Sequence, residues 1–263
     1  MNAPCIIVTR HGTNSAIATV ALNNPERLNA LNKLMWERLG VVMRELSADD
    51  TLRCVVLRGA GDKAFAAGAD IAEFASERAD SKQAKSYGNL IHDTMQSVAS
   101  CKHPTVAMIN GPCVGGGLEI AAMCDIRICG ESSRFGVPIN KLGLTMGYGE
   151  LVGLLALVGR AVALEILLEG RVFDAAEALQ KRLVNRVVPD GQIEFEAYAT
   201  AQRIAAGAPL VARWHKQFIE RLMVRAKISS AEWDEGFACF DSEDYRTGVA
   251  AFLQKQKPVF EGK

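Results

Sequence analysis

The feature that most constrains the fold is a recurring order of a short apolar strand, a loop that carries glycine, and a helix. The strand "CVVLRG" (54–59) leads into the loop "GAGDKAFAAGADI". After a helix predicted over 84–99, the strand "PTVAMING" leads into "GPCVGGG" and a helix over 118–123, and a third pass gives "DIRICGE" and "SRFGVP". Strands that alternate with helices predict an α/β fold, and wholly apolar strands are typical of a sheet covered on both faces.

Three further segments have readable patterns. Alternating apolar residues predict a hairpin with strands over 6–10 and 16–22. Apolar residues at helical spacing then predict a helix over 32–46. The polar segment 75–89 is interpreted as a mobile flap or a loosely held helix, with an ordinary solvated loop as the alternative.

The C-terminal part of the chain has a different character. From residue 192 onward no strand pattern remains, so the sequence is divided into a core over 1–191 and a helical region over 192–263. The apolar faces of the predicted helices exceed what this region could bury on itself. We therefore expect it to pack on another surface, in the same chain or in another subunit.

Composition excludes several classes of partner. The 263 residues carry 30 Lys plus Arg and 30 Asp plus Glu, so the basic excess typical of nucleic-acid binding is absent. The seven cysteines form no CxxC pair, which predicts buried free thiols and a cytoplasmic location, and the four histidines have no metal-ligand spacing. The richest apolar stretch, 142–168, is interrupted by glycines and charges, which predicts no membrane span and no membrane partner.

Two glycine-bearing loops carry the candidate chemistry. "FAAGAD" and "VGGG" each follow a predicted strand and offer backbone N–H groups, and such groups aimed at one point stabilise an oxygen that gains negative charge. Glu119 follows in the first turn of the next helix, where it could move a proton or could merely complement the helix dipole. The phosphate-binding patterns GxxxxGK[ST] and GxGxxG and the nucleophile pattern GxSxG do not occur.

Segments in a fixed order along nearly the whole chain resemble the crotonase (enoyl-CoA hydratase/isomerase) superfamily. They are "LNNPERLNALN", "KAFAAGADIAEF", "PTVAMINGPCVGGGLEIAAMCDIRI", "RFGVPINKLGL", "LVGRAVALEILLEGRVFDAAEALQKRLVNRVVP" and "SEDYRTGVAAFLQKQKPVF". The resemblance implies a spiral of ββα turns with a C-terminal helical region that builds a homotrimer or a dimer of trimers. It also implies an acyl-CoA thioester substrate, with no cofactor other than the coenzyme A that the substrate carries.

The resemblance also assigns roles to residues. The thioester oxygen would be held by the N–H groups of Ala69 and Gly116, and Glu119 would be the acid and base. Arg27 and Leu28 would line the coenzyme channel, while Phe252 and Lys255 would reach the coenzyme near a subunit boundary. The remaining substrate-binding residues implied by the matching motifs are Ala67, Gly68, Asp70, Ile71, Gly115, Pro138 and Ile139.

One position departs from the hydratase pattern. Hydratases of the family carry a second glutamate directly after the proline of "FGxPE", where this chain has Ile139. Glu119 alone would then have to activate water and reprotonate the α-carbon, with Asn140 as a candidate to orient the water. Hydration of a 2-enoyl-CoA is the first hypothesis, and the absence of the second glutamate is the feature of the sequence that argues against efficient hydration.

Other readings stay open at the level of sequence. A single carboxylate suffices for a Δ3,Δ2-enoyl-CoA isomerase, which shuttles a proton between carbons 2 and 4. Another enolate reaction could use Tyr148 or Glu150, although a helix entrance with a capping acid is the preferred interpretation of these two residues. The third reading is a non-catalytic acyl-CoA-binding member that has lost the second acid.

Overall fold

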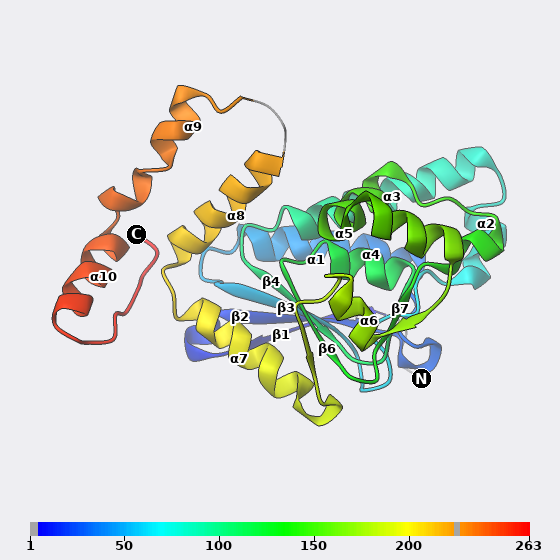
Figure 1. Cartoon of the computed structure of the whole chain (residues 1–263), viewed down its shortest axis with the longest axis horizontal. Coiled ribbons are helices and arrows are strands. Elements are labelled where there is room, and N and C mark those ends of the chain that lie inside the picture. Colours follow the sequence, from blue (N-terminus) through cyan, green and yellow to red (C-terminus); the bar gives the residue numbers. More distant parts are fainter. Residues whose placement is uncertain (1–4, 224–226) are drawn as a thin grey trace.

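A six-stranded sheet runs through the middle of the molecule in the computed structural model, which describes residues 5–223 and 227–263 (Figure 1). Its strands, in spatial order, are β1 (Cys5–His11), β2 (Ile17–Asn23), β3 (Cys54–Gly59), β4 (Thr105–Ile109), β6 (Ile126–Gly130) and β9 (Arg186–Val188). Neighbouring strands are parallel except for β1 and β2, which form the predicted antiparallel hairpin. A smaller sheet contains β5 (Pro112–Val114), β7 (Arg134–Gly136) and β8 (Phe173–Asp174).

Helices cover both faces of the large sheet. In chain order, the α-helices of the described residues are α1 (Lys33–Ala48), α2 (Phe74–Glu77), α3 (Ser81–Ala99), α4 (Gly116–Ala122), α5 (Tyr148–Glu169), α6 (Ala175–Gln180), α7 (Ile193–Ala205), α8 (Pro209–Met223), α9 (Ser230–Glu235) and α10 (Glu243–Leu253). Figure 1 shows α1, α3, α4 and α5 on one side of the sheet and α7 on the other. In β3, Val55 and Leu57 belong to the first apolar core, whereas Cys54 and Val56 belong to the second. The apolar run over 54–57 of this strand is explained by the double coverage.

Successive passes of the chain have the same construction. β4 belongs to the large sheet, β5 to the small one, and α4 follows; β6, β7 and α5 repeat that order. After β3, an isolated bridge from Ala66 to Cys113 takes the place of the second strand. The predicted α/β fold of ββα turns is therefore confirmed, and in each pass a helix follows the segment that lies at the small sheet.

The polar segment 75–89 is helical in the structure. Helix α3 begins at Ser81, three residues before the predicted start at Ala84, because the side chain of Asp80 accepts the N–H of Gln83 and caps the first turn. The short helix α2 precedes it. The interpretation of 75–89 as an irregular solvated loop is therefore wrong, and an N-cap signal at Asp80 was present in the sequence.

Helix α5 passes a test of length and composition for crossing a membrane, with a mean hydropathy of 2.2 over an 18-residue window. Only 22% of that window is buried in the molecule. Gly159 interrupts the helix with φ 70° and ψ 173°, a conformation that is nearly exclusive to glycine. Each half is then much shorter than the roughly 20 helical residues that a bilayer core requires. The expectation of no membrane partner remains a prediction.

The described residues after 192 form helices joined by irregular segments and contain no strand, as expected. Helix α7 packs Ile193, Ala197 and Ala201 against the second face of the large sheet. Helices α8, α9 and α10 extend away from the sheet (Figure 1). The division of the chain at residue 191 stays a prediction.

Candidate active site

Two glycine loops meet beside the small sheet. The N–H of Val114 donates to the carbonyl of Ala66 at 3.0 Å, which ties the second loop to the first. Gly68 and Gly115 have positive φ angles of 108° and 52°, and a side chain at either position would be strained. Glycine is therefore required because of the turn that each loop makes.

The N–H groups of Ala69 and Gly116 lie close together. A Cβ atom on Gly116 would be 3.5 Å from the nitrogen of Ala69, and one on Gly68 would be 3.5 Å from the nitrogen of Gly116. Neither amide is among the donors to loop and cap acceptors within the described residues. Two unpaired donors that face one space are the geometry of an oxyanion hole.

Trp36 fixes how closely this space is packed. The same Cβ on Gly116 would lie 2.9 Å from Cζ2 of the Trp36 indole, which is closer than real Cβ atoms approach a neighbour. Trp36 is fully buried on α1. The middle glycine of "VGGG" therefore leaves room for the indole ring as well as a free N–H.

Glu119 lies in the first turn of α4 and is 7% exposed. Burial raises its pKa to about 8, the nearby carboxylate of Glu150 adds to the shift, and the guanidinium of Arg78 opposes it. A carboxyl group with a pKa near neutrality can both accept and donate a proton at cellular pH.

These groups share one cavity of about 120 Å³, here called the Glu119 cavity. Sequence reasoning had named half of its lining: Ala67, Gly68, Ala69, Ile71, Gly115, Gly116, Glu119, Pro138 and Ile139. The residues that it did not assign to the site are Trp36, Phe74, Arg78, Ile91, Val114, Leu142, Leu144 and Thr145. Since ligand pockets usually measure roughly 300–1,000 Å³, this cavity fits a short acyl group rather than a whole coenzyme.

Five of the predicted residues lie outside the cavity lining. Arg27 and Asp70 form an ion pair at 2.6 Å, and the carbonyl of Leu28 accepts the N–H of Ala67 at 2.9 Å, so this turn supports the first glycine loop from behind. Phe252 is 83% exposed on α10, and Lys255 follows that helix. Their contact with coenzyme at a subunit boundary stays a prediction.

The structure separates the other candidate polar groups. Asn140 donates its amide to the carbonyl of Leu168 at 3.0 Å and does not line the cavity, so the hypothesis that it orients water is wrong. Tyr148 is 95% exposed and also lies outside. Glu150 accepts the N–H of Gly147 at 2.6 Å, as expected of a capping acid, yet it lines the cavity too.

Metal and thiol chemistry have little support at this site. The described residues contain no group of three or more His, Cys, Asp or Glu side chains that could hold a metal ion. All seven cysteines are free; Cys5 and Cys239 are half-buried, and the other five are buried as the sequence predicted. What the cavity does offer is an oxyanion hole beside one proton-transfer group.

An α/β fold of ββα turns with paired backbone amides and an adjacent buried carboxyl group defines a class of protein that stabilises an enolate-like oxyanion. The family model described as "Enoyl-CoA hydratase/isomerase" matches residues 12–263, and the chain belongs to this family of enzymes. The resemblance found in the sequence motifs is thereby confirmed.

Individual relatives agree with this assignment. The chain is 36% identical over 244 residues to the short-chain-enoyl-CoA hydratase of Clostridium acetobutylicum, covering 92% of each protein. It is 32% identical over 249 residues to the crotonyl-CoA hydratase of Syntrophomonas wolfei, covering 94% of this chain and 95% of that protein.

Solved structures extend the comparison to the fold. An enoyl-CoA hydratase/carnithine racemase from Magnetospirillum magneticum superimposes with a TM-score of 0.96 at 53% identity, covering 98% of this chain and 96% of that one. An enoyl-CoA hydratase from Bacillus anthracis gives a TM-score of 0.90 at 31% identity, covering 98% and 99%. The crotonase-type fold that the motifs implied is therefore confirmed.

Proposed function

We propose that this enzyme adds water to a 2-enoyl thioester of coenzyme A. The observation that carries the proposal is the placement of Glu119 in one cavity with the free N–H groups of Ala69 and Gly116. The thioester oxygen accepts both N–H groups, which stabilise the negative charge that the oxygen gains when carbon 3 is attacked.

Glu119 moves the proton in this mechanism. Its carboxylate takes a proton from water as the water oxygen bonds to carbon 3 and the double-bond electrons pass into the enolate. The same carboxyl group then returns that proton to carbon 2, which regenerates the carboxylate and leaves a 3-hydroxyacyl thioester. The raised pKa of Glu119 suits this double role, since both the protonated and the ionised carboxyl group are populated near neutral pH.

The substitution Glu119→Gln tests the proposal. Turnover of crotonyl-CoA should fall roughly 10³-fold, because the amide keeps the shape of the side chain and cannot carry the proton. Binding of a saturated acyl-CoA should be nearly unchanged. Glu45→Gln, on the exposed face of α1, is the matched control. Full turnover by the Glu119 variant would refute the assignment.

Isomerisation is the second candidate, and Ile139 favours it. This side chain lines the cavity where hydratases of the family have their second glutamate, so one wall that could hold water is apolar. Incubation with crotonyl-CoA and with a 3-enoyl-CoA in heavy water separates the two reactions. A hydrated, deuterated product supports hydration, whereas a shifted double bond without added water supports isomerisation.

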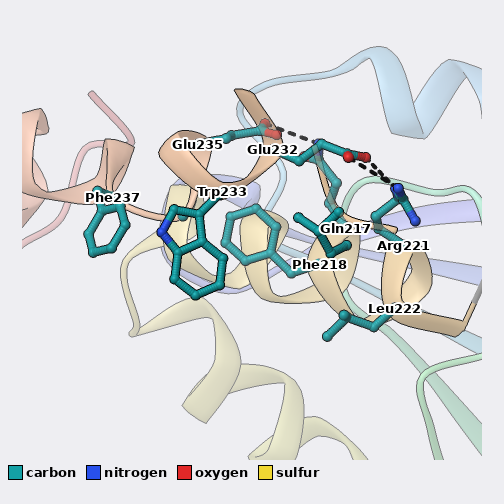
Figure 2. Close-up of a pocket in the computed structure, with 10 residues that line it drawn as sticks. Gln217, Phe218, Arg221, Leu222, Glu232, Trp233, Glu235 and Phe237 are labelled. Atoms are coloured by element: carbon teal, nitrogen blue, oxygen red, sulfur yellow. Dashed lines mark hydrogen bonds and ion pairs between the residues drawn. The ribbon is translucent and has the colours of Figure 1, made fainter. Parts of the chain in front are cut away.

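We also propose that the chain assembles as a homotrimer or a dimer of trimers. An apolar hollow of about 410 Å³ between α8 and α9, the α8–α9 hollow, is lined by Phe218, Leu222, Trp233 and Phe237, among others (Figure 2). Trp233 is 68% exposed in the single chain. Large exposed apolar side chains favour burial against another subunit. Sedimentation that gave only monomers at micromolar concentration would argue against this assembly.

In that assembly, Phe252 and Lys255 of one chain would contact coenzyme bound to another, and Arg27 and Leu28 would line its channel. Lys255→Ala should then raise the KM for acyl-CoA and leave kcat nearly unchanged. The coenzyme A of the substrate is proposed as the only cofactor-like group. The unpaired cysteines favour the reducing environment of the cytoplasm.

A further inference from the structure

One wall of the Glu119 cavity carries a cation that makes no direct ion pair with any described residue. Arg78, which directly follows α2, lines this cavity together with Glu119. It forms no ion pair with any acid in the described part of the chain, and its Nε is buried without a hydrogen-bond partner. Guanidinium groups are seldom left this way, because a buried unpaired donor is costly.

The acids that lie near Arg78 in the sequence are already occupied, and among them Asp80 caps α3 by accepting the N–H of Gln83. Glu73 accepts the backbone N–H of Lys33 at 2.8 Å, and Glu77 pairs with the ammonium group of the same lysine at 2.8 Å. Arg78 is held instead by ring stacking, with its guanidinium carbon 4.5 Å from the centre of Phe74 and 4.2 Å from that of Tyr87. Cation–π contacts of this kind fix the position of the cation and leave its N–H groups free.

Two more buried polar atoms are unpartnered beside this cation. The indole Nε1 of Trp36 and the hydroxyl of Tyr87 have no well-aligned hydrogen-bond partner within the described residues, although Trp36 and Arg78 both lie close enough to Tyr87 to lower its pKa. Both side chains are almost fully buried, and Trp36 also lines the cavity. Burial raises the pKa of Tyr87 to about 12, with Arg78 acting against that shift, so the phenol stays protonated and remains a donor. Arg78 and Trp36 therefore bring two unpartnered donors to the cavity wall, and the hydroxyl of Tyr87, whose ring stacks on Arg78, lies next to them.

We propose that Arg78, Tyr87 and Trp36 form a subsite for a carboxylate carried by the acyl group of the substrate. The substrate would then be a short 2-enoyl-CoA whose far end is a carboxylate, a monothioester of an unsaturated dicarboxylic acid. A carboxylate supplies four acceptor positions and a negative charge, which satisfy the three donors and balance the cation. This inference rests on the proposed hydration for the enoyl part of the substrate only.

The small volume of the Glu119 cavity and the position of Arg78 near Glu119 indicate that the carboxylate belongs to the acyl group of the substrate. The cavity of about 120 Å³ accommodates a few carbon atoms and a carboxylate, and Glu119 shares it, so the reacting carbons lie near Arg78. The apolar walls formed by Ile91 and Ile139 would contact the carbons in between. A phosphate of the coenzyme would belong to the part of the substrate outside this space.

Binding of two saturated thioesters tests the subsite without any need for turnover. The pair is pentanedioyl-CoA and its terminal amide, which have the same shape and differ by one charge. Calorimetric titration of the unmodified enzyme should show the carboxylate binding about tenfold or more tightly, as expected for a charge-assisted hydrogen bond. In Arg78→Met this ratio should fall to nearly one. Arg38→Met, at an exposed position on α1, should keep the original ratio.

Two further variants keep the test decisive. Arg78→Lys keeps the charge and loses the planar fork, so an intermediate ratio is expected. Tyr87→Phe removes one hydroxyl and should lower the ratio severalfold, even if Arg78→Met does not fold. Equal binding of both thioesters to the unmodified enzyme would overturn the proposal and indicate that water satisfies the donors. Equal weakening of both thioesters in Arg78→Met would also overturn it, since Arg78 would then serve the coenzyme.

The result of this binding test can be distinguished from the result of the test of the proposed hydratase function. Hydration of crotonyl-CoA that depends on Glu119, together with a ratio near one, would leave the function standing and remove the subsite. A high ratio with no hydration of any 2-enoyl thioester, including pent-2-enedioyl-CoA, would leave the subsite standing and remove the hydratase mechanism.

Discussion

The α8–α9 hollow and the Glu119 cavity differ in almost every physical respect. The α8–α9 hollow holds about 410 Å³ and has mostly apolar walls, while its charged pair, Arg221 and Glu232, is mutually neutralised. The Glu119 cavity holds about 120 Å³, yet it contains two free backbone donors, a buried carboxyl group and an unpaired cation. A large apolar hollow thus indicates a surface that another protein surface buries. Unsatisfied polar groups in a small cavity indicate instead the site of the reaction.

The contrast has an energetic side. Apolar walls such as those of the α8–α9 hollow gain free energy when they are covered by another surface. The polar groups of the Glu119 cavity cost stability in the folded chain, because they are withdrawn from water without full compensation. Folding therefore maintains a strained polar site only where the rest of the core is stable enough to hold it.

The largest effect is expected on the free energy of unfolding, because the Glu119 cavity, unlike the α8–α9 hollow, buries an ionisable group. The pKa of Glu119 is about 8 in the folded chain and near 4.5 when unfolded, so the folded chain binds the extra proton between these values and loses stability as the pH rises from 4.5 to 8. Glu119→Gln should increase the free energy of unfolding at pH 8 by on the order of a few kcal/mol. Denaturant titrations should show the gain disappearing near pH 4.5. An equal gain at both pH values would show that burial of charge is not the cause.

The next effect concerns the oxyanion hole. Gly116→Ala places a methyl group against the indole of Trp36 and displaces one of the two donors, so kcat should fall about 10²-fold. Gly88→Ala in α3 is the matched control, because a Cβ there meets no atom within 4 Å. Comparable losses in the two variants would point to general destabilisation rather than to a lost donor.

A smaller effect should appear in the pH profile of kcat/KM. Glu150→Gln removes a like charge, and it should move the limb assigned to Glu119 to lower pH while the amide oxygen still accepts the N–H of Gly147. Arg78→Met removes an opposite charge and should move the same limb to higher pH. Shifts in the same direction in both variants would contradict the electrostatic account.

The smallest effect on catalysis is expected at the α8–α9 hollow. Trp233→Ala should change kcat less than about twofold, since a surface contact that is distant from the reacting atoms does not stabilise the transition state. The same variant should shift the assembly toward smaller species in sedimentation at low protein concentration. A large loss of kcat without dissociation would break the comparison by giving this hollow a direct role in the reaction.

Sequence reasoning succeeded where the signal is local. The apolar strand at 54–59 and the glycine loops are recognisable because a doubly covered strand and a positive φ angle each demand particular residue types. Helix α1 shows the limit of periodicity, since Leu34 is one of the apolar residues near helical spacing that predict the helix over 32–46 and is nevertheless 68% exposed. It lies in the first turn, where the face that meets the core is not yet defined by neighbours on both sides.

The missed site residues depend on contacts between distant segments. Arg78 belongs to a polar stretch, and only the stacking on Phe74 and Tyr87 directs it into the cavity. For Glu150 the sequence offered a capping role and a role at the site as alternatives, and the structure combines them because of how α5 lies against α4. Neither arrangement leaves a pattern in the order of the amino acids.

The interruption of α5 at Gly159 has a consequence for the reaction site some distance away. Because φ 70° with ψ 173° is accessible to glycine almost alone, any other residue there would favour a straight, continuous rod. The N-terminal half of α5, which carries Glu150, would then point along a new direction. The direction of the Glu150 carboxylate thus depends on an achiral residue two and a half turns away. Substitutions at Gly159 should therefore change the activity of the enzyme without altering any residue that lines the cavity.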